Sequence, residues 1–109
     1  MFFEGRLPDF NLGTANGASC DPALQDALAE VLRVHAQSGG RYSHVVNGRF
    51  KGGYITRHYG RPESGIGAVQ LELAQCTYMD EASFEYMPER AAPVENVIRA
   101  LLQCCMDYV

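Results

Sequence analysis

Apolar residues recur at helical spacing in two segments of the chain. The first is predicted to be a helix that begins at Asp21-Pro22, because Asp21 can cap it and proline suits the first helical position. Gly39-Gly40 is predicted to end it. The second segment is predicted to be a helix from about Pro93 to Tyr108. The two apolar faces comprise Leu24, Ala27, Leu28, Val31 and Leu32, and Val94, Val97, Ile98, Leu101, Leu102 and Cys105.

Three shorter segments have the pattern of β-strands. Residues 42–46 are β-prone and precede Asn47-Gly48, which predicts a strand followed by a turn. Residues 69–75 carry apolar side chains at 69, 71 and 73, and this alternation predicts a second strand. Residues 54–56 are a candidate for a third, short strand.

Turn-forming residues mark the predicted loops. Polar, glycine-rich stretches predict loops over 47–53 and 60–65. The first 20 residues, Met1 to Cys20, are also predicted to be a loop, because Gly13 and Gly17 argue against a regular element there. A loop this long in a small domain indicates either a function or a neighbour around which the loop wraps.

The predicted order is loop, α, β, loop, β, α, and alternating elements favour an α/β layer fold. The length of 109 residues suits one domain or part of one. The two main helices are expected to cover one face of a sheet. Two to three strands are few for such a fold, which indicates that part of the sheet lies elsewhere. We therefore predict a single partial domain over residues 1–109, with residues 1–20 as a loop segment.

Composition and charge exclude several classes of protein. Hydrophobic residues make up 47% of the chain and charged residues 20%, which is ordinary for a globular protein. The net charge is −4 and no basic block occurs, so we expect no nucleic-acid surface. The first residues lack the pattern of a signal peptide. No apolar run approaches the roughly 20 residues of a transmembrane helix, so we expect no membrane contact.

The four cysteines are Cys20, Cys76, Cys104 and Cys105, and no CxxC pair occurs among them. This spacing fits neither a zinc knuckle nor the disulfide framework of a secreted protein. We expect free thiols in a reducing, cytoplasmic protein. Cys20 is interpreted as a buried or loop thiol, with a role as nucleophile as the alternative.

Glu72 is the first candidate for chemistry, because a carboxylate between apolar neighbours in a strand is unfavourable unless it is paired or useful. It could act as a general base or acid at a strand end beside a cleft. Gln70 shares its face, however, so this face can also be the solvated side of a half-buried strand. The pattern alone leaves both interpretations open.

Arg49, Lys51 and Arg57 are the second candidate, since they lie within nine positions on or beside glycine-rich turns. Glycine lets the backbone approach a ligand closely, and the planar guanidinium of arginine matches a carboxylate. The group could therefore bind a small anionic substrate. Three exposed basic residues on a surface loop are the alternative interpretation.

The histidines do not indicate a metal site. His35, His44 and His58 lack the short spacings of motifs such as HExxH. A catalytic zinc site usually needs three protein ligands, and this sequence supplies no convincing set. We expect no metal to be held within this chain alone.

Four long motifs are LPDFNLGT at 7–14, GASCDP at 17–22, YSHVVNGRFKGGYITRHYGRP at 42–62 and AVQLELAQCTYMDE at 68–81. Together they resemble the N-formylglutamate amidohydrolase (deformylase) family of histidine degradation, over about residues 4–108. The resemblance implies the C-terminal part of a zinc-carboxypeptidase-like α/β fold with a mixed sheet. It also implies that a zinc-activated water hydrolyses N-formyl-L-glutamate, a small acidic N-acyl amino acid, to formate and L-glutamate.

The resemblance also implies roles for single residues. Glu72 in QLEL matches a late-strand glutamate, which implies a general base for the water and then an acid for the leaving nitrogen. Arg57 in YITRHYG is the implied clamp for a substrate carboxylate. Asn47, Arg49 and Lys51 in NGRFKGG are further candidates for the same pocket.

The chain departs from the family pattern in its length. Family members are more than twice as long, and their metal-binding histidine motifs precede the stretch that matches Met1. We therefore expect a fragment with a base and substrate-side residues, and expect Zn²⁺ in the complete enzyme but none bound by this chain alone. The alternatives are a non-catalytic module that binds a small acidic ligand, and a homo-oligomer that shields the exposed sheet.

Overall fold

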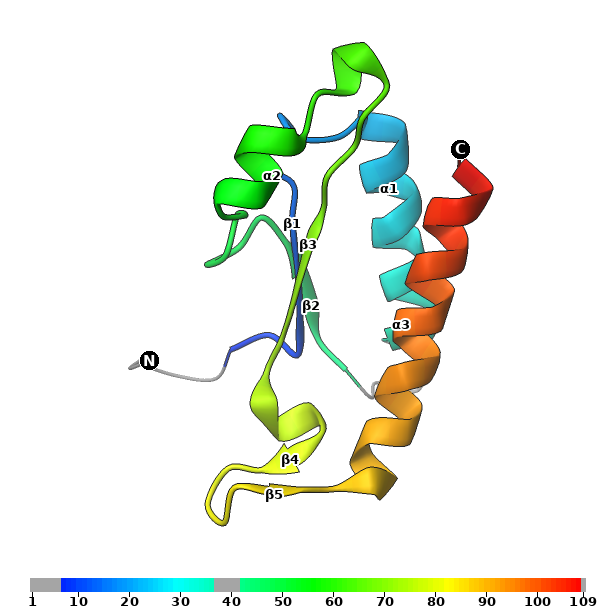
Figure 1. Cartoon of the computed structure of the whole chain (residues 1–109). Coiled ribbons are helices and arrows are strands. Elements are labelled where there is room, and N and C mark those ends of the chain that lie inside the picture. Colours follow the sequence, from blue (N-terminus) through cyan, green and yellow to red (C-terminus); the bar gives the residue numbers. More distant parts are fainter. Residues whose placement is uncertain (1–6, 37–41, 109) are drawn as a thin grey trace.

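In the computed structural model, residues 7–36 and 42–108 are described. Their elements are β1 (Phe10–Gly13), α1 (Pro22–Val31), the π-helix η1 (Leu32–Ala36), β2 (His44–Val46), α2 (Tyr54–Tyr59), the 3-10 helix η3 (Pro62–Ser64), β3 (Gln70–Leu73), the 3-10 helix η4 (Gln75–Thr77), β4 (Met79–Asp80), β5 (Glu85–Tyr86) and α3 (Pro88–Tyr108). α1 and α3 pack side by side on one side of the strands, and α2 lies on the other side (Figure 1). The predicted α/β layers are confirmed.

A three-stranded mixed sheet lies between these layers, with the strand order β2-β1-β3. β1 is parallel to β2, and Asn11 lies opposite Val45. β1 is antiparallel to β3, where Asn11 lies opposite Glu72 and Gly13 lies opposite Gln70. β4 and β5 form a separate antiparallel pair. The strands predicted at 42–46 and 69–75 are therefore confirmed as β2 and β3.

The central strand β1 lies inside the segment predicted to be a loop, so that prediction is wrong for residues 10–13. Phe10 and Leu12 are buried in the core, and Asn11 between them points to the other face, which is the alternation of a strand. Gly13 does not interrupt the strand. A Cβ at Gly13 would lie only 2.9 Å from the backbone of Lys51 and of Gly52, so glycine lets a second segment cross β1 here.

The predicted first helix is confirmed at its start, because α1 begins at Pro22. Asp21 makes no capping hydrogen bond; its carboxylate accepts a hydrogen bond of 2.7 Å from the Tyr108 hydroxyl, which joins the start of α1 to the end of α3. The helix continues through η1 to Ala36. Its predicted end at Gly39-Gly40 lies outside the described residues.

The C-terminal helix α3 begins earlier than predicted, at Pro88 rather than near Pro93, and Pro93 lies inside it. Pro88 suits the first helical position, and the Glu89 carboxylate suits the positive N-terminal end of a helix. These first-turn preferences, together with the Ala91 N–H donating to the Met87 carbonyl at 2.9 Å, explain the earlier start.

The prediction of a strand over 54–56 is wrong, because Tyr54–Tyr59 form the helix α2. Thr56 is 2% exposed, and its hydroxyl donates to the Gly53 carbonyl at 2.8 Å. This local contact closes the first turn, so the β preference of the Tyr-Ile-Thr sequence is overridden. Tyr54 and Ile55 remain exposed on the outer side of α2.

The core fills the space between the sheet and the two long helices. Its buried members include Phe10, Leu12, Leu24, Leu28, Leu32, Val94, Val97 and Leu101. Leu71 and Leu73 of β3 pack against this cluster, so Gln70 and Glu72 point to the opposite face of the sheet. As predicted, the two amphipathic helices cover one face. Within residues 7–36 and 42–108, no helix has the length and apolar character needed to span a membrane.

Leu28→Ala is expected to lower the free energy of unfolding by about 2–5 kcal/mol, because Leu28 is 1% exposed and its removal leaves a cavity. Leu102→Ala is the matched control, since Leu102 is 60% exposed on α3 and its loss should change stability by less than about 0.5 kcal/mol. Urea unfolding followed by circular dichroism measures both values. Equal losses in the two variants would contradict this placement of the core.

Gly13→Ala is expected to cost about 1–3 kcal/mol of stability, because its Cβ would press on the backbone of residues 51 and 52. Gly53→Ala is the control, since the nearest atom to its added Cβ is the Gln70 Oε1 at 3.6 Å, an ordinary contact. Thermal unfolding of the two variants compares them directly. A Gly13→Ala variant as stable as Gly53→Ala would show that the loop does not cross β1 this closely.

Candidate functional site

The loop of residues 47–53 covers part of the polar face of the sheet and leads into α2. It begins where β2 ends and crosses over β1 at Gly13. The Ala15 N–H donates to the Lys51 carbonyl at 2.7 Å, which attaches the middle of the loop to the chain just after β1. Because parallel strands end at the same edge of a sheet, the ends of β1 and β2 and this loop form one edge.

Asn47 holds the start of this loop through its side-chain amide. Its Oδ1 accepts a hydrogen bond of 2.8 Å from the Thr14 N–H, and its Nδ2 donates to the Thr14 hydroxyl at 2.8 Å. Thr14 is fully buried, and its hydroxyl also donates to the Gln25 Oε1 at 2.5 Å. Asn47 has φ of 52°, a left-handed conformation that asparagine tolerates better than most residues. The predicted substrate-binding side chain of Asn47 thus takes part in a structural network.

Two further amides hold the rest of the loop from the sheet below. Asn11 is buried in β1; its Nδ2 donates to the Phe50 carbonyl at 2.5 Å and its Oδ1 accepts from the Phe50 N–H at 3.3 Å. Gln70 at the start of β3 accepts a hydrogen bond of 2.9 Å from the Gly53 N–H through its Oε1. The loop is therefore attached to both β1 and β3 by side chains that point to the polar face.

Glu72 lies next to Gln70 on this face and is half-buried. The Gln70 Nε2 donates to the Glu72 Oε1 at 2.7 Å. The structure gives no hydrogen bond from the described residues to the Glu72 Oε2. Glu72 is thus half-buried and hydrogen-bonded, and its role as a base or as part of a solvated strand face stays a prediction.

Arg57 lies in α2, with its side chain exposed. Its Nη1 donates to the Gly52 carbonyl at 3.2 Å, and its backbone N–H donates to the Gly53 carbonyl at 3.2 Å. Because the Gly53 N–H binds Gln70, a continuous series of hydrogen bonds joins Glu72, Gln70, Gly53 and Arg57. We call these four residues the Glu72–Arg57 network.

The structure connects some of the predicted site residues and leaves others apart. Glu72 is connected to the backbone of Arg57 through the Glu72–Arg57 network, and the exposed side chains of Arg49 and Lys51 lie on the loop above the sheet. Asn11 is a member of the site that sequence reasoning missed. The signal was present, because Asn11 alternates with Phe10 and Leu12, but the glycines around it obscured the strand.

The described residues do not form a metal site. Within residues 7–36 and 42–108, no group of three or more His, Cys, Asp or Glu side chains lies close enough to hold a metal ion. His58 stacks on Tyr54, with ring centroids 4.8 Å apart, and His35 is exposed. The Nδ1 of His44 is buried without a hydrogen-bond partner among the described residues, but His44 belongs to no such group of metal donors there.

The four cysteines all lie among the described residues and are free thiols, as predicted. Burial raises the pKa of the Cys20 thiol, and the nearby Asp21 carboxylate and Cys105 add to this shift. Cys20 therefore stays protonated at neutral pH and is poorly suited to act as a nucleophile.

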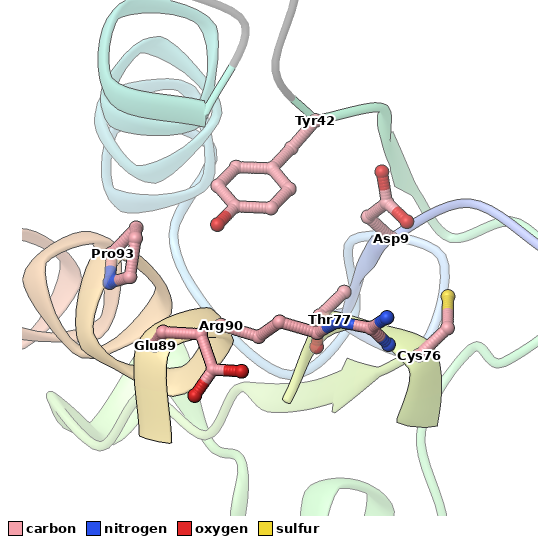
Figure 2. Close-up of a pocket in the computed structure, with 7 residues that line it drawn as sticks. All are labelled: Asp9, Tyr42, Cys76, Thr77, Glu89, Arg90 and Pro93. Atoms are coloured by element: carbon pink, nitrogen blue, oxygen red, sulfur yellow. The ribbon is translucent and has the colours of Figure 1, made fainter. Parts of the chain in front are cut away.

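A pocket of about 270 Å³ lies at the other end of β1, where the strand begins; its lining residues are Asp9, Tyr42, Cys76, Thr77, Glu89, Arg90 and Pro93. Figure 2 shows the Arg90 side chain extending from α3 across the pocket toward Thr77. The Asp9 carboxylate already accepts a hydrogen bond of 3.0 Å from the Ser43 N–H. With two carboxylates and one guanidinium, this lining does not favour an acidic ligand, and it includes none of the residues predicted to bind one.

Comparison with known proteins gives consistent matches. The model of the N-formylglutamate amidohydrolase family (FGase) matches residues 1–79. N-formylglutamate deformylases from Pseudomonas aeruginosa and Pseudomonas putida are 64% and 58% identical over 107 residues, which are 97% of this chain and 39% of each relative. The crystal structure of N-formylglutamate amidohydrolase from Ralstonia eutropha JMP134 superposes with a TM-score of 0.77 and 28% identity, over 100% of this chain and 37% of that one.

The chain thus spans about two-fifths of the length of the curated relatives it matches. The family match covers most of its residues, including the loop of residues 47–53, α2 and β3. The resemblance read from the sequence motifs is confirmed. This chain belongs to the N-formylglutamate amidohydrolase family.

Proposed function

We propose that this chain positions N-formyl-L-glutamate and carries the general base for its hydrolysis to formate and L-glutamate, as part of the longer enzyme that the family's length implies. The supporting observation is the Glu72–Arg57 network, which links the Glu72 carboxylate through Gln70 and Gly53 to the backbone N–H of Arg57. The names of the relatives support the substrate.

Glu72 is the proposed base. Its Oε2 would take a proton from the attacking water as the water oxygen bonds to the formyl carbon. The protonated carboxyl would then donate this proton to the amide nitrogen as the C–N bond breaks, which releases formate and the amine of glutamate. The hydrogen bond from Gln70 restrains the Glu72 Oε1, which leaves the Oε2 as the proposed proton acceptor.

Arg57 is the proposed clamp for a substrate carboxylate. N-formyl-L-glutamate has two carboxylates, so a cationic surface suits it. One hydrogen bond to Gly52 leaves further guanidinium donors of Arg57 for a carboxylate. Arg49 and Lys51 add positive charge on the adjoining loop. A direct contact of Asn47 with substrate stays a prediction, since its amide binds Thr14.

The zinc that the resemblance implies would supply an activated water and polarise the formyl carbonyl. The described residues do not fit such a site, because no cluster of metal donors occurs among them. Zinc in the complete enzyme, the zinc-carboxypeptidase-like fold, the cytoplasmic location, the role in histidine degradation and a homo-oligomer all stay predictions. The mixed sheet with helices on both sides supports the fold prediction.

A chimera tests the proposed function. The 109 residues replace the matching two-fifths of the Pseudomonas aeruginosa relative, and release of formate from N-formyl-L-glutamate is measured. We expect an active chimera. A folded but inactive chimera would favour a non-catalytic module, which calorimetry with L-glutamate on the 109-residue chain would then examine.

Glu72→Gln in this chimera is expected to lower kcat by about 10²–10⁴-fold with little change in KM, because the amide cannot accept the proton of water. Glu63→Gln, which removes an exposed carboxylate from η3, is the matched control and should leave kcat unchanged. Steady-state kinetics gives both parameters. Full activity of Glu72→Gln would remove this residue from the proposed role.

Arg57→Lys is expected to raise KM about 10–100-fold, because lysine keeps the charge but loses the planar pair of donors, and charge-assisted hydrogen bonds contribute about 1.5–3 kcal/mol. Arg99→Lys, an exposed position on α3, is the control. An unchanged KM in Arg57→Lys would show that another cation binds the substrate carboxylate.

A further inference from the structure

We propose that Gln70 is a positioning residue that sets the orientation of the Glu72 carboxylate and couples it to the start of α2. This inference rests on the proposed function of Glu72. The residue would not touch substrate; it would act by holding the base and the clamp in one relative arrangement.

The two ends of the Gln70 amide have different partners. Its Nε2 donates to the Glu72 Oε1 at 2.7 Å, and its Oε1 accepts from the Gly53 N–H at 2.9 Å. A neutral amide offers a donor and an acceptor at the same tip, which neither a carboxylate nor an aliphatic side chain can do. Both bonds are made from a half-buried position, where solvent competes less effectively.

The space that the amide occupies is created by the strand pairing. Gln70 lies opposite Gly13 in the register of β1 and β3. Gly13 has no side chain, so the backbone of residues 51 and 52 lies directly over the strand there. The next residue, Gly53, is thereby brought within reach of the Gln70 side chain.

Gly53 is the N-cap residue of α2, directly before its first residue, Tyr54. Its carbonyl accepts hydrogen bonds from the Thr56 hydroxyl at 2.8 Å and from the Arg57 N–H at 3.2 Å. A hydrogen bond to the Gly53 N–H therefore fixes the first turn of the helix that carries Arg57. Movement of this turn would change the distance between the clamp and the base.

The neutral charge of Gln70 is part of the inference. The amide holds Glu72 without introducing a second charge, whereas a carboxylate at position 70 would repel an ionised neighbour. A misplacement of about 1 Å in a reacting group can cost on the order of 10²-fold in rate. Gln70 is thus expected to affect both the rate and its dependence on pH.

Two substitutions in the active chimera separate the two hydrogen bonds. Gln70→Glu retains an acceptor for the Gly53 N–H but cannot donate to Glu72, and Gln70→Met loses both bonds. In the pH dependence of kcat/KM, we expect Gln70→Glu to shift the acid limb to higher pH by about one unit. Gln70→Met should lower kcat on the order of 10-fold or more, with no upward movement of the acid limb. Gln75→Glu, an exposed position in η4, is the charge-matched control and should leave the profile unchanged.

The outcomes are distinct from those of the proposed function. An inactive unsubstituted chimera would refute the proposed function, and the positioning role would fall with it. An active chimera in which Gln70→Glu leaves the acid limb and kcat unchanged would overturn this inference alone. A purely structural role would lower the melting temperature of both variants without moving the pH profile, and this result would also overturn it. Failure of Gln70→Glu to fold would count against the proposal, since the bond to Gly53 is retained.

The hydrogen bonds can also be observed in the 109-residue chain without activity. In ¹H–¹⁵N spectra, Glu72→Gln should shift the side-chain NH₂ signal of Gln70, whereas the control Glu63→Gln should not. Gln70→Met should shift the Gly53 amide signal more than Gln70→Glu does. If Glu72→Gln left the NH₂ signal of Gln70 unshifted, that result would contradict the contact on which the inference depends.

Discussion

The close approach of the loop to Gly13 is the constraint on which the candidate site depends. A Cβ on the central strand at this point would collide with the backbone at residues 51 and 52. Its absence lets the loop lie directly on the sheet, within reach of the amides of Asn11 and Gln70. Buried polar backbone is costly unless its hydrogen bonds are made, and these amides make them. Raising the loop would therefore break several bonds at once.

The same strands serve two purposes because successive side chains point to opposite faces. On one face, Leu71 and Leu73 pack with α1 and α3 in the apolar core. On the other face, the antiparallel pairing of β3 with β1 fixes Gln70 opposite Gly13 and Glu72 opposite Asn11. A base carried on a paired strand is held more rigidly than one on a free loop. The strand β3 thus contributes both to the core and to the face that holds the proposed base.

In the candidate site, the neutral amide of Gln70 lies between the Glu72 carboxylate and the start of the helix that carries Arg57. Arg49, Lys51 and Arg57 lie on the loop and α2, where the carboxylates of an acidic substrate would be attracted. Glu72 would be repelled by that substrate if it lay among them without restraint. Gln70 stands between the carboxylate and the start of α2, and it binds both through one amide. This arrangement ties the proposed base to the first turn of the helix that carries the proposed clamp.

The sequence by itself determined most of α1, α3 and β3, because the periodicity of their apolar residues reflects one buried face and needs no distant contact to be read. The β-prone residues of β2 and the Asn47-Gly48 turn after it likewise needed only local sequence. It also determined the family and the identity of Glu72 and Arg57 as candidates. Only the tertiary structure decided that residues 10–13 form the central strand and that residues 54–59 form a helix, since each depends on contacts that override local preference. The pairing of Gln70 with Glu72 and Gly53 was likewise decided by strand register and by the space above Gly13, which no local pattern encodes.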